Sequence, residues 1–297
     1  LGDLLFDKRD PAGALDCFVA LARQRPDDGR LWNNIAVTQL ALGRLEDAEA
    51  AARRARTLQP ASALAWLNLG RALAARGRRD DALAALRESL RLDARIADAH
   101  DLAGRLEAQA GAWGRAVQSF RSALAAGAGA MTASRLGDSL MQRGEVADAI
   151  AAYRDAEGRD AVHAAENGSR ALFALHADER ATPDQVYAAH REWAVRHAPA
   201  RAADHANARD PDRKLRVGYL SPRLGRSSAA FLLLPVLERH DPTATAFHCY
   251  AEDDAGDEVS RRIRELASGW RETRGLDDET LARVIREDGI DILVDLA

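Results

Sequence analysis

Apolar and polar positions in residues 1–163 follow the period of amphipathic helices, and this pattern itself repeats about every 34 residues. Glycines mark the repeat at a nearly constant interval; they are Gly43, Gly77, Gly111 and Gly144. Alanines keep the same spacing at Ala14, Ala48, Ala82, Ala116 and Ala149. A glycine can end one helix, and an alanine lets the following helix approach closely. The chain is therefore expected to begin with stacked helical hairpins.

In most copies a large apolar residue follows one helical turn after the repeat alanine, where it is expected to fill the space between neighbouring hairpins. These residues are Phe18, Leu86, Phe120 and Tyr153. Pro26 and Pro60 lie where one hairpin gives way to the next, because proline cannot continue a helix. A pair of helices in every unit of about 34 residues is the signature of the tetratricopeptide repeat. We place five units at 1–28, 29–62, 63–96, 97–129 and 130–163, of which the first is partial.

Stacked hairpins of this kind expose the first helix of each unit on a concave groove. Asn34 and Asn68 share one position of that helix in consecutive units, and asparagine is a poor helix former. The pair could hydrogen-bond the backbone of an extended peptide; the alternative is two solvated polar residues on an exposed face. Replacing both by alanine should then weaken peptide capture and leave thermal stability nearly unchanged. Leu102 and Arg135 interrupt the series in later units.

Residues 164–213 begin with a helical pattern that lacks the spacing of the repeat, and we predict a helical bridge and linker there. Thr182 and Pro183 are typical of a capped helix start. The tract 199–213 is polar and contains two prolines, as expected for a domain boundary.

From residue 214 to residue 297, short apolar runs alternate with helical segments. Strands are expected at 215–220, 246–251 and 290–296, and helices at 229–239, 257–267 and 276–288. This alternation predicts a parallel sheet of the doubly wound kind. So short a segment that ends on a strand suggests an incomplete domain, open on one side. The fold class expected for the whole chain is an α-solenoid followed by an incomplete α/β domain.

Ligands of parallel sheets bind beyond the carboxyl ends of the strands, so the loop after the first strand is the candidate for chemistry. It carries Arg223, Arg226, Ser227 and Ser228 and leads into a helix N-terminus, which favours an anion. The loop lacks the spacing of dinucleotide-binding and P-loop motifs, which argues against those sites. An ordinary capped turn is the alternative. The acidic stretch 252–258 is better explained by a helix dipole than by a metal site.

Composition narrows the classes of function. The 42 basic and 46 acidic residues give a net charge of −4, which provides no electrostatic case for nucleic acid. No apolar run reaches the roughly 18 to 20 residues that cross a bilayer. Cys17 and Cys249 are expected to be buried thiols in a reducing compartment. A cytoplasmic protein with no metal and no membrane partner is expected, and a homo-oligomer stays possible.

Several runs of the chain together resemble the O-GlcNAc transferase/SPINDLY family of glycosyltransferases. They are Leu172–Leu175, Ala188–Trp193, Lys214–Pro222, Phe231–Pro235, His240–Asp241, His248–Tyr250 and Asp288–Ala297. The resemblance implies a metal-independent enzyme of the GT-B fold, with residues 214–297 at the start of its first lobe. Such an enzyme transfers N-acetylglucosamine from UDP-GlcNAc to Ser or Thr of proteins. The resemblance also implies that Asn34 and Asn68 contact an acceptor protein or peptide in the groove.

Two departures from the family bear on activity. The family usually has a histidine at the position we align with Ser227, and a serine hydroxyl is no base near pH 7 without an activating partner. No catalytic residue is therefore assigned, while Arg223, Arg226 and Ser228 are expected to contact substrate. The chain ends before the second lobe, which in GT-B enzymes holds most of the nucleotide sugar, so we expect residues 1–297 to be inactive alone. The alternative is a non-catalytic tetratricopeptide scaffold or adaptor with a degenerate transferase-like domain.

Overall fold

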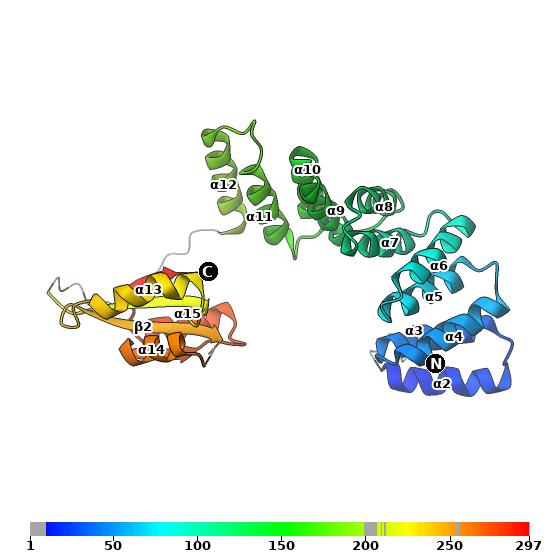
Figure 1. Ribbon diagram of the computed structural model, residues 1–297, viewed down its shortest axis with the longest axis horizontal. Coiled ribbons are helices and arrows are strands. Elements are labelled where there is room, and N and C mark those ends of the chain that lie inside the picture. Colours follow the sequence, from blue (N-terminus) through cyan, green and yellow to red (C-terminus); the bar gives the residue numbers. More distant parts are fainter. Residues whose placement is uncertain (1–9, 199–206, 209, 211, 254–255, 297) are drawn as a thin grey trace. The chain divides into compact units, whose positions relative to one another are not determined.

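The computed structural model describes residues 10–198, 207, 208, 210, 212–253 and 256–296. They divide into two compact units, Leu1–Ala200 and Arg201–Ala297, each with hydrophobic clusters of its own. The first unit is a row of paired helices and the second is a sheet with helices packed against it (Figure 1). The expected fold class, an α-solenoid followed by a partial α/β domain, is confirmed.

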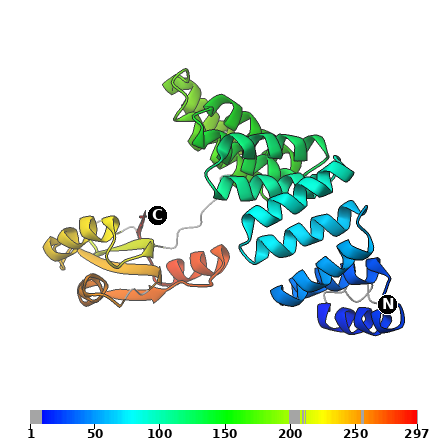
Figure 2. The ribbon, with the colours of Figure 1, turned by 45° about the vertical axis from the view of Figure 1, so that its right-hand side comes forward.

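The first unit consists of helical hairpins that lie side by side in both views (Figure 1 and Figure 2). Its helices are α2 (Pro11–Gln24), α3 (Gly29–Ala41), α4 (Leu45–Leu58), α5 (Ala63–Ala75), α6 (Arg79–Leu92), α7 (Ala97–Gln109), α8 (Trp113–Ala125), α9 (Ala130–Gln142), α10 (Val146–Arg159), α11 (Ala164–Leu175) and α12 (Pro183–His197). The four repeat glycines lie between the helices of a pair and have positive φ angles from 70° to 74°. Glycine adopts this conformation without the penalty that a Cβ would add.

A second glycine, in the first helix of a pair, lets the two helices touch. A Cβ on Gly70 would lie 3.0 Å from Leu86, and one on Gly137 would lie 2.5 Å from the ring of Tyr153. A Cβ on Gly104 would likewise lie 2.7 Å from the ring of Phe120. The large residues are buried. They therefore pack against the first helix of their own hairpin, a contact that the repeat spacing alone did not identify.

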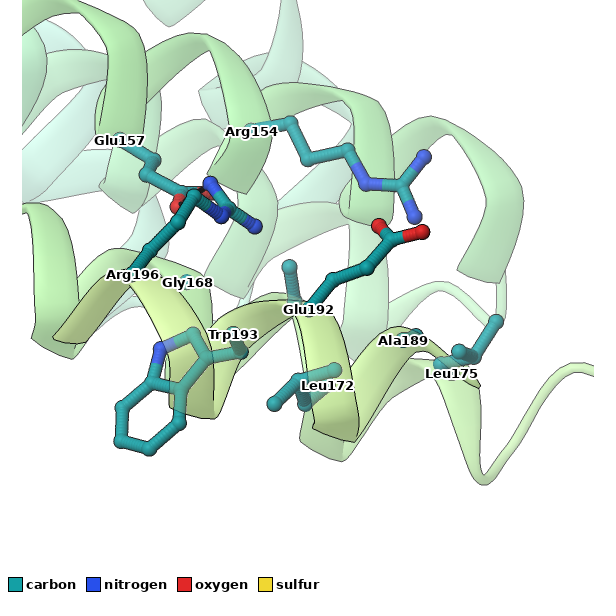
Figure 3. A pocket seen from close by; sticks show the side chains of 10 residues that line it. Arg154, Glu157, Gly168, Leu172, Leu175, Ala189, Glu192, Trp193 and Arg196 are labelled. Atoms are coloured by element: carbon teal, nitrogen blue, oxygen red, sulfur yellow. Dashed lines mark hydrogen bonds and ion pairs between the residues drawn. The ribbon is translucent and has the colours of Figure 1, made fainter. Parts of the chain in front are cut away.

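The helices α11 and α12 continue the array beyond residue 163. Glu157 of α10 accepts hydrogen bonds from Arg196 at 2.5 Å and from His197 at 3.1 Å. Trp193 lies beside Gly168 (Figure 3), where a Cβ would lie 2.8 Å from the indole. The indole N–H of Trp193 donates to the carbonyl of Ala165 at 3.1 Å. The glycine-to-aromatic contact of the earlier pairs is thus repeated here. Its partners are farther apart in the sequence than in the earlier pairs, which explains the lost spacing.

An aromatic side chain near the start of three successive first helices ties each hairpin to the turn before it. The indole N–H of Trp32 donates to the carbonyl of Pro26 at 2.8 Å, and that of Trp66 donates to Pro60 at 2.9 Å. In the next unit the imidazole of His100 replaces the indole, at 3.0 Å from the carbonyl of Ala94. The recurrence of tryptophan in the sequence therefore has a structural cause.

The second unit is a four-stranded parallel sheet in the order β3-β2-β1-β4. Its elements are β1 (Leu215–Arg223), α13 (Ser228–Arg239), β2 (Thr245–Asp253), α14 (Glu258–Leu266), β3 (Gly269–Glu272), α15 (Asp278–Glu287) and β4 (Ile292–Asp295). All the strands and helices predicted here are present. The strand β3 is missing from the prediction because its four residues hold a single large apolar side chain and show no alternation.

The core of the second unit lies on one face of this sheet. Val217 and Cys249 pack there against Leu233 of α13 and Ile263 of α14. The Cys249 thiol is fully buried, as predicted, and burial raises its pKa to about 12. The prediction is wrong for Cys17, which is half-buried because it lies beside the buried stripe of α2 rather than in it. At the β4 edge Ile292 is 47% exposed, so that end of the described sheet is open.

Candidate functional site

Asn34 of α3 lies half-buried beside a hollow of about 770 Å³. The side chains of Arg30, Asn33 and Leu64 also line this hollow. Leu64, on the next first helix, is 56% exposed. With Gln59, which also lines it, the hollow offers a cation, three amides and an apolar side chain to an extended segment. Asn33 is absent from the predicted site residues, although its position next to Asn34 is visible in the sequence.

Asn68 is placed differently, although it occupies the same position of α5. Only 4% of its surface is exposed. Its Nδ2 donates to Asn33 Oδ1 at 2.8 Å, and its Oδ1 accepts a hydrogen bond from Arg71 at 3.1 Å. The amide thus joins two successive first helices. This arrangement revises the expectation that alanine at both positions would leave stability unchanged, because Asn68 holds two repeats together whether or not it also meets a peptide.

Polar contacts between successive first helices continue along the array as ion pairs. Arg71 of α5 pairs with Asp98 of α7 at 2.5 Å. The later rungs are Arg135 with Asp101 at 3.0 Å and Arg170 with Asp138 at 3.1 Å. Arg135 interrupts the asparagine series in sequence but continues this series of contacts in space. The other interrupting residue, Leu102, belongs to the core. The later units therefore present paired charges where the earlier units present amides.

The loop after β1 is a capped turn. The hydroxyl of Ser227 accepts a hydrogen bond from the Ala230 backbone N–H at 3.2 Å and is the N-cap of α13. The backbone N–H of Arg226 donates at 2.7 Å to Asp257, which caps α14 by accepting from the Ser260 N–H at 2.9 Å. These backbone hydrogen bonds, that from Ser260 foremost, hold the pKa of Asp257 below its ordinary value.

The structure brings the predicted loop residues together at the carboxyl edge of the sheet. Arg223, Arg226 and Ser228 are exposed there. Their role as substrate contacts stays a prediction. In the acidic stretch, Asp257 caps a helix as the dipole argument predicts, while residues 254 and 255 lie outside the described residues. The described part of the chain holds no group of three or more metal-ligating side chains.

Two aspartates just before β4 connect it to other parts of the α/β unit. The sequence analysis did not identify them. Asp291 accepts hydrogen bonds from the Arg213 guanidinium, at 2.6 Å for one of them, and from the Arg216 backbone N–H at 2.9 Å. Asp288 accepts from the Tyr250 hydroxyl at 2.8 Å and from Arg271 at 2.5 Å. The arginines lower the pKa of both carboxyls, and that of Asp291 lies well below the usual range. The run 288–297, which carries part of the family resemblance, therefore contains structural carboxylates.

Known proteins resemble both units of this chain. The tetratricopeptide repeat family matches residues 1–63 and 67–130. The probable UDP-N-acetylglucosamine–peptide N-acetylglucosaminyltransferase SPINDLY of Arabidopsis thaliana is 31% identical over 137 residues, which are 43% of this chain and 15% of that protein. A solved mutant of the Thermobaculum terrenum O-GlcNAc transferase is 30% identical with a TM-score of 0.51, over 80% of this chain and 46% of that one. The resemblance to the O-GlcNAc transferase/SPINDLY family is confirmed.

The likeness to the family is not confined to the repeats. A match to 80% of the chain exceeds the two thirds that precede residue 201, so it extends into the α/β unit. The pilus biogenesis factor PilW, which is 20% identical with a TM-score of 0.55 over 65% of this chain and 89% of that one, shares the fold alone. The chain spans about 15% of the length of the SPINDLY relative and 46% of the solved transferase.

The repeat family also indicates the kind of partner that the first unit binds. Tetratricopeptide arrays are protein-binding folds, so the first unit is a surface for protein–protein interaction. None of the helices in the described residues is long and apolar enough to cross a membrane.

Proposed function

We propose that this chain is the acceptor-recruiting part and the beginning of the first GT-B lobe of a protein O-GlcNAc transferase-like enzyme in the cytoplasm. The enzyme would transfer N-acetylglucosamine from UDP-GlcNAc to Ser or Thr of proteins without a metal. One observation carries the proposal: the 30% identical match to a solved O-GlcNAc transferase runs through the repeats into the α/β unit. A repeat array of unrelated function would have no reason to match across that junction.

In this proposal the acceptor lies against the first helices of units two and three. Asn34 and Asn33 supply amides to the acceptor backbone, and the exposed Leu64 supports an apolar side chain. Asn68 acts as a positioning residue, since its hydrogen bond fixes the Asn33 carboxamide. Hydrogen bonds to backbone atoms are indifferent to side-chain identity, which suits an enzyme that modifies many acceptors.

The proposal gives the β1 loop a binding role. Arg223 and Arg226 carry two positive charges beside the N-terminus of α13, where an anion such as a diphosphate is favoured. Ser227 is assigned no proton transfer. In the described residues its hydroxyl contacts only backbone groups of Arg223 and Ala230, so no base activates it. Most of the donor surface would belong to a second lobe outside residues 1–297.

The first experiment tests acceptor recruitment. Residues 1–297 are applied to an array of Ser- and Thr-containing peptides, and the affinities of bound peptides are compared between the wild type and Asn34→Ala. We expect about fivefold to tenfold weaker binding, which corresponds to about one hydrogen-bonded contact. The matched control is Thr57→Ala on the exposed side of α4, which should bind as the wild type does. Equal affinities for both variants would contradict the groove assignment.

The second experiment tests the chemistry. The intact gene product is incubated with radiolabelled UDP-GlcNAc and the captured peptides, and label on Ser or Thr is expected. Residues 1–297 alone should transfer no sugar and give no calorimetric signal with UDP. Acceptor capture without transfer by the intact product would instead favour a tetratricopeptide adaptor with a degenerate transferase domain, a function that the serine at position 227 supports. Tight UDP binding by residues 1–297 would show that the donor surface is wrongly placed.

A further inference from the structure

Two hollows of the repeat array are built from equivalent positions of successive units. The Trp32 hollow, of about 640 Å³, is lined by residues of α2, α3 and α4. The Trp66 hollow, of about 560 Å³, is lined by residues of α4, α5 and α6. Both tryptophans are half-buried, and both are held by the same hydrogen bond to the carbonyl of a preceding proline. The two sites can therefore be compared position by position.

An arginine of the chain itself lines the Trp66 hollow and lies over its indole ring. The Cζ atom of Arg56 lies 5.4 Å from the centroid of the Trp66 ring, which is within cation–π range. The Nε atom of Arg56 is buried and has no hydrogen-bond partner. The ring face is thus a principal contact of this planar group. This arrangement shows what kind of side chain the position over the indole accepts.

The Trp32 hollow lacks that arginine. The residue one repeat before Arg56 is Ala22, and Ala50 and Ala51 add two more small side chains to the lining. Among the described residues, no guanidinium lies over the Trp32 ring as Arg56 lies over Trp66. The guanidinium that covers the ring in one unit therefore has no counterpart in the unit before it.

Two further residues of the Trp32 hollow are hydrogen-bond acceptors. Gln39 replaces the leucine found at the equivalent position, and its Oε1 is buried without a donor. An unpaired buried acceptor is unfavourable, so a donor that reached it after a small side-chain rotation would be stabilised. Asp47 lies at the rim and has no ion pair within the described residues, whereas its equivalent Asp81 pairs with Arg78 at 2.6 Å.

The positive charges around the Trp32 hollow do not exclude a cation. Arg54 lines the hollow but is paired with Asp27 at 3.3 Å. Arg23 and Asp47 also line it. The lining arginines Arg23 and Arg54 are thus accompanied by the lining carboxylate of Asp47 and by Asp27, the partner of Arg54. A side chain that binds here must make apolar contacts, because most of the lining is apolar. It must also supply hydrogen-bond donors, because Gln39 and Asp47 are acceptors.

We propose that the Trp32 hollow binds an arginine side chain of a partner protein, in the place that Arg56 occupies one unit later. The guanidinium lies on the Trp32 ring and donates to Gln39 and Asp47, while its alkyl stem packs against Val19 and Ala22. Lysine binds less well, because its compact ammonium is strongly hydrated and cannot stack. The site differs from the proposed acceptor hollow and does not depend on the transferase function.

The test uses residues 1–297 and the blocked tripeptide acetyl-Gly-Arg-Gly-amide, with lysine, citrulline and leucine analogues as probes. The indole N–H signals are followed by NMR, and that of Trp32 is assigned from its loss in Trp32→Phe. The Trp32 signal should shift with the arginine peptide at millimolar concentration and at least fivefold less readily with the lysine and citrulline analogues. An equal response to leucine, or no response of Trp32 to arginine, would overturn the proposal.

Two variants exchange the properties of the hollows. Ala22→Arg copies the Trp66 hollow and should weaken binding at least tenfold. Arg56→Ala uncovers the other ring and should add a shift of the Trp66 signal at similar peptide concentrations. Asp47→Asn, at an exposed position, should weaken arginine binding severalfold while the fold is kept, so the proposal stays testable if Ala22→Arg does not fold. Unchanged binding in Asp47→Asn together with no new shift in Arg56→Ala would contradict it.

Discussion

The contacts that stabilise the repeat array differ in kind from those that stabilise the α/β unit. In the repeat array the decisive contacts are local and recur: a glycine in one helix meets a large residue of the helix that follows, as in Gly70 with Leu86. In the α/β unit a single carboxylate, Asp291, binds Arg213 and the backbone of Arg216, which precede it by 78 and 75 residues. Damage to the array should therefore stay local, whereas damage to the α/β unit should spread through all of it.

The largest effect is expected from Asp291→Ala. The variant leaves the guanidinium of Arg213 without its partner and removes the link between the starts of β1 and β4. Because the remaining guanidinium loses its partner, this variant is expected to lower the stability of the α/β unit more than the other variants lower that of their own unit. Thermal unfolding monitored by hydrogen exchange should show loss of protection in 212–296 and an unaltered array. The control Glu279→Gln, at an exposed position of α15, should change neither unit. An equal loss in both units would contradict their independence.

A smaller and more local effect is expected from Gly137→Ala. The new Cβ would lie 2.5 Å from the Tyr153 ring, so α9 and α10 must move apart. Overpacking of this kind destabilises by about 1–3 kcal/mol. Exchange protection should fall in α9, α10 and their neighbours while α3 and α4 keep theirs. The matched control is Gly158→Ala in α10, where a Cβ meets nothing within 4 Å and should stabilise slightly. Loss of protection throughout the array would indicate cooperativity rather than local failure.

The third prediction concerns a contact between units of the array. Asn68→Ala removes the hydrogen bonds to Asn33 and Arg71 and should lower the stability of the array by about 1–2 kcal/mol. Asn34→Ala should have a smaller effect, because Asn34 is less buried. Thermal midpoints of the two variants measure the difference. The reverse order would mean that the structural role belongs to Asn34.

The smallest effect is expected from mild acid. The pKa values of Asp288 and Asp291 are lowered in the folded state by their arginine partners. The unfolded state therefore takes up protons first: the stabilisation is complete well above the unfolded value near 4 and declines as the pH falls toward the depressed folded values. From pH 7 to pH 4 the midpoint of the α/β unit should fall by a few degrees, and by less in Asp291→Ala. An unchanged pH dependence in that variant would show that Asp291 is not the group responsible.

The sequence predicts the parts of this fold that depend on short spacings. Gly43 and its equivalents reveal the hairpins because a left-handed turn between two helices requires glycine at a fixed interval. The hairpin α11–α12 escapes that reasoning, since a longer connection separates Gly168 from Trp193 while the contact itself is kept. The strand β3 is too short to show a period.

The candidate site divides in the same way. The position of Asn34 and Asn68 on first helices follows from the repeat, but the hydrogen bond from Asn68 to Asn33 depends on how adjacent hairpins pack. The loop after β1 begins later than predicted, because the strand continues through Arg223 instead of ending at residue 220. That Ser227 serves as a helix cap could be suspected from its residue type, because serine is common at N-caps, yet only the hydrogen bond to Ala230 shows it.

The rungs that connect successive first helices make the stiffness of the array depend on its salt environment. The Asn33–Asn68 rung joins neutral amides, so dissolved ions do not screen it. The rungs formed by Arg135 with Asp101 and by Arg170 with Asp138 are ion pairs at partly exposed positions, and they weaken as ionic strength rises. At high salt the joints near α9 and α11 should therefore loosen while the joint between α3 and α5 keeps its angle. The part of the array that contains α9 and α11 is therefore expected to become more flexible as the salt concentration rises, while the part that contains α3 and α5 is not.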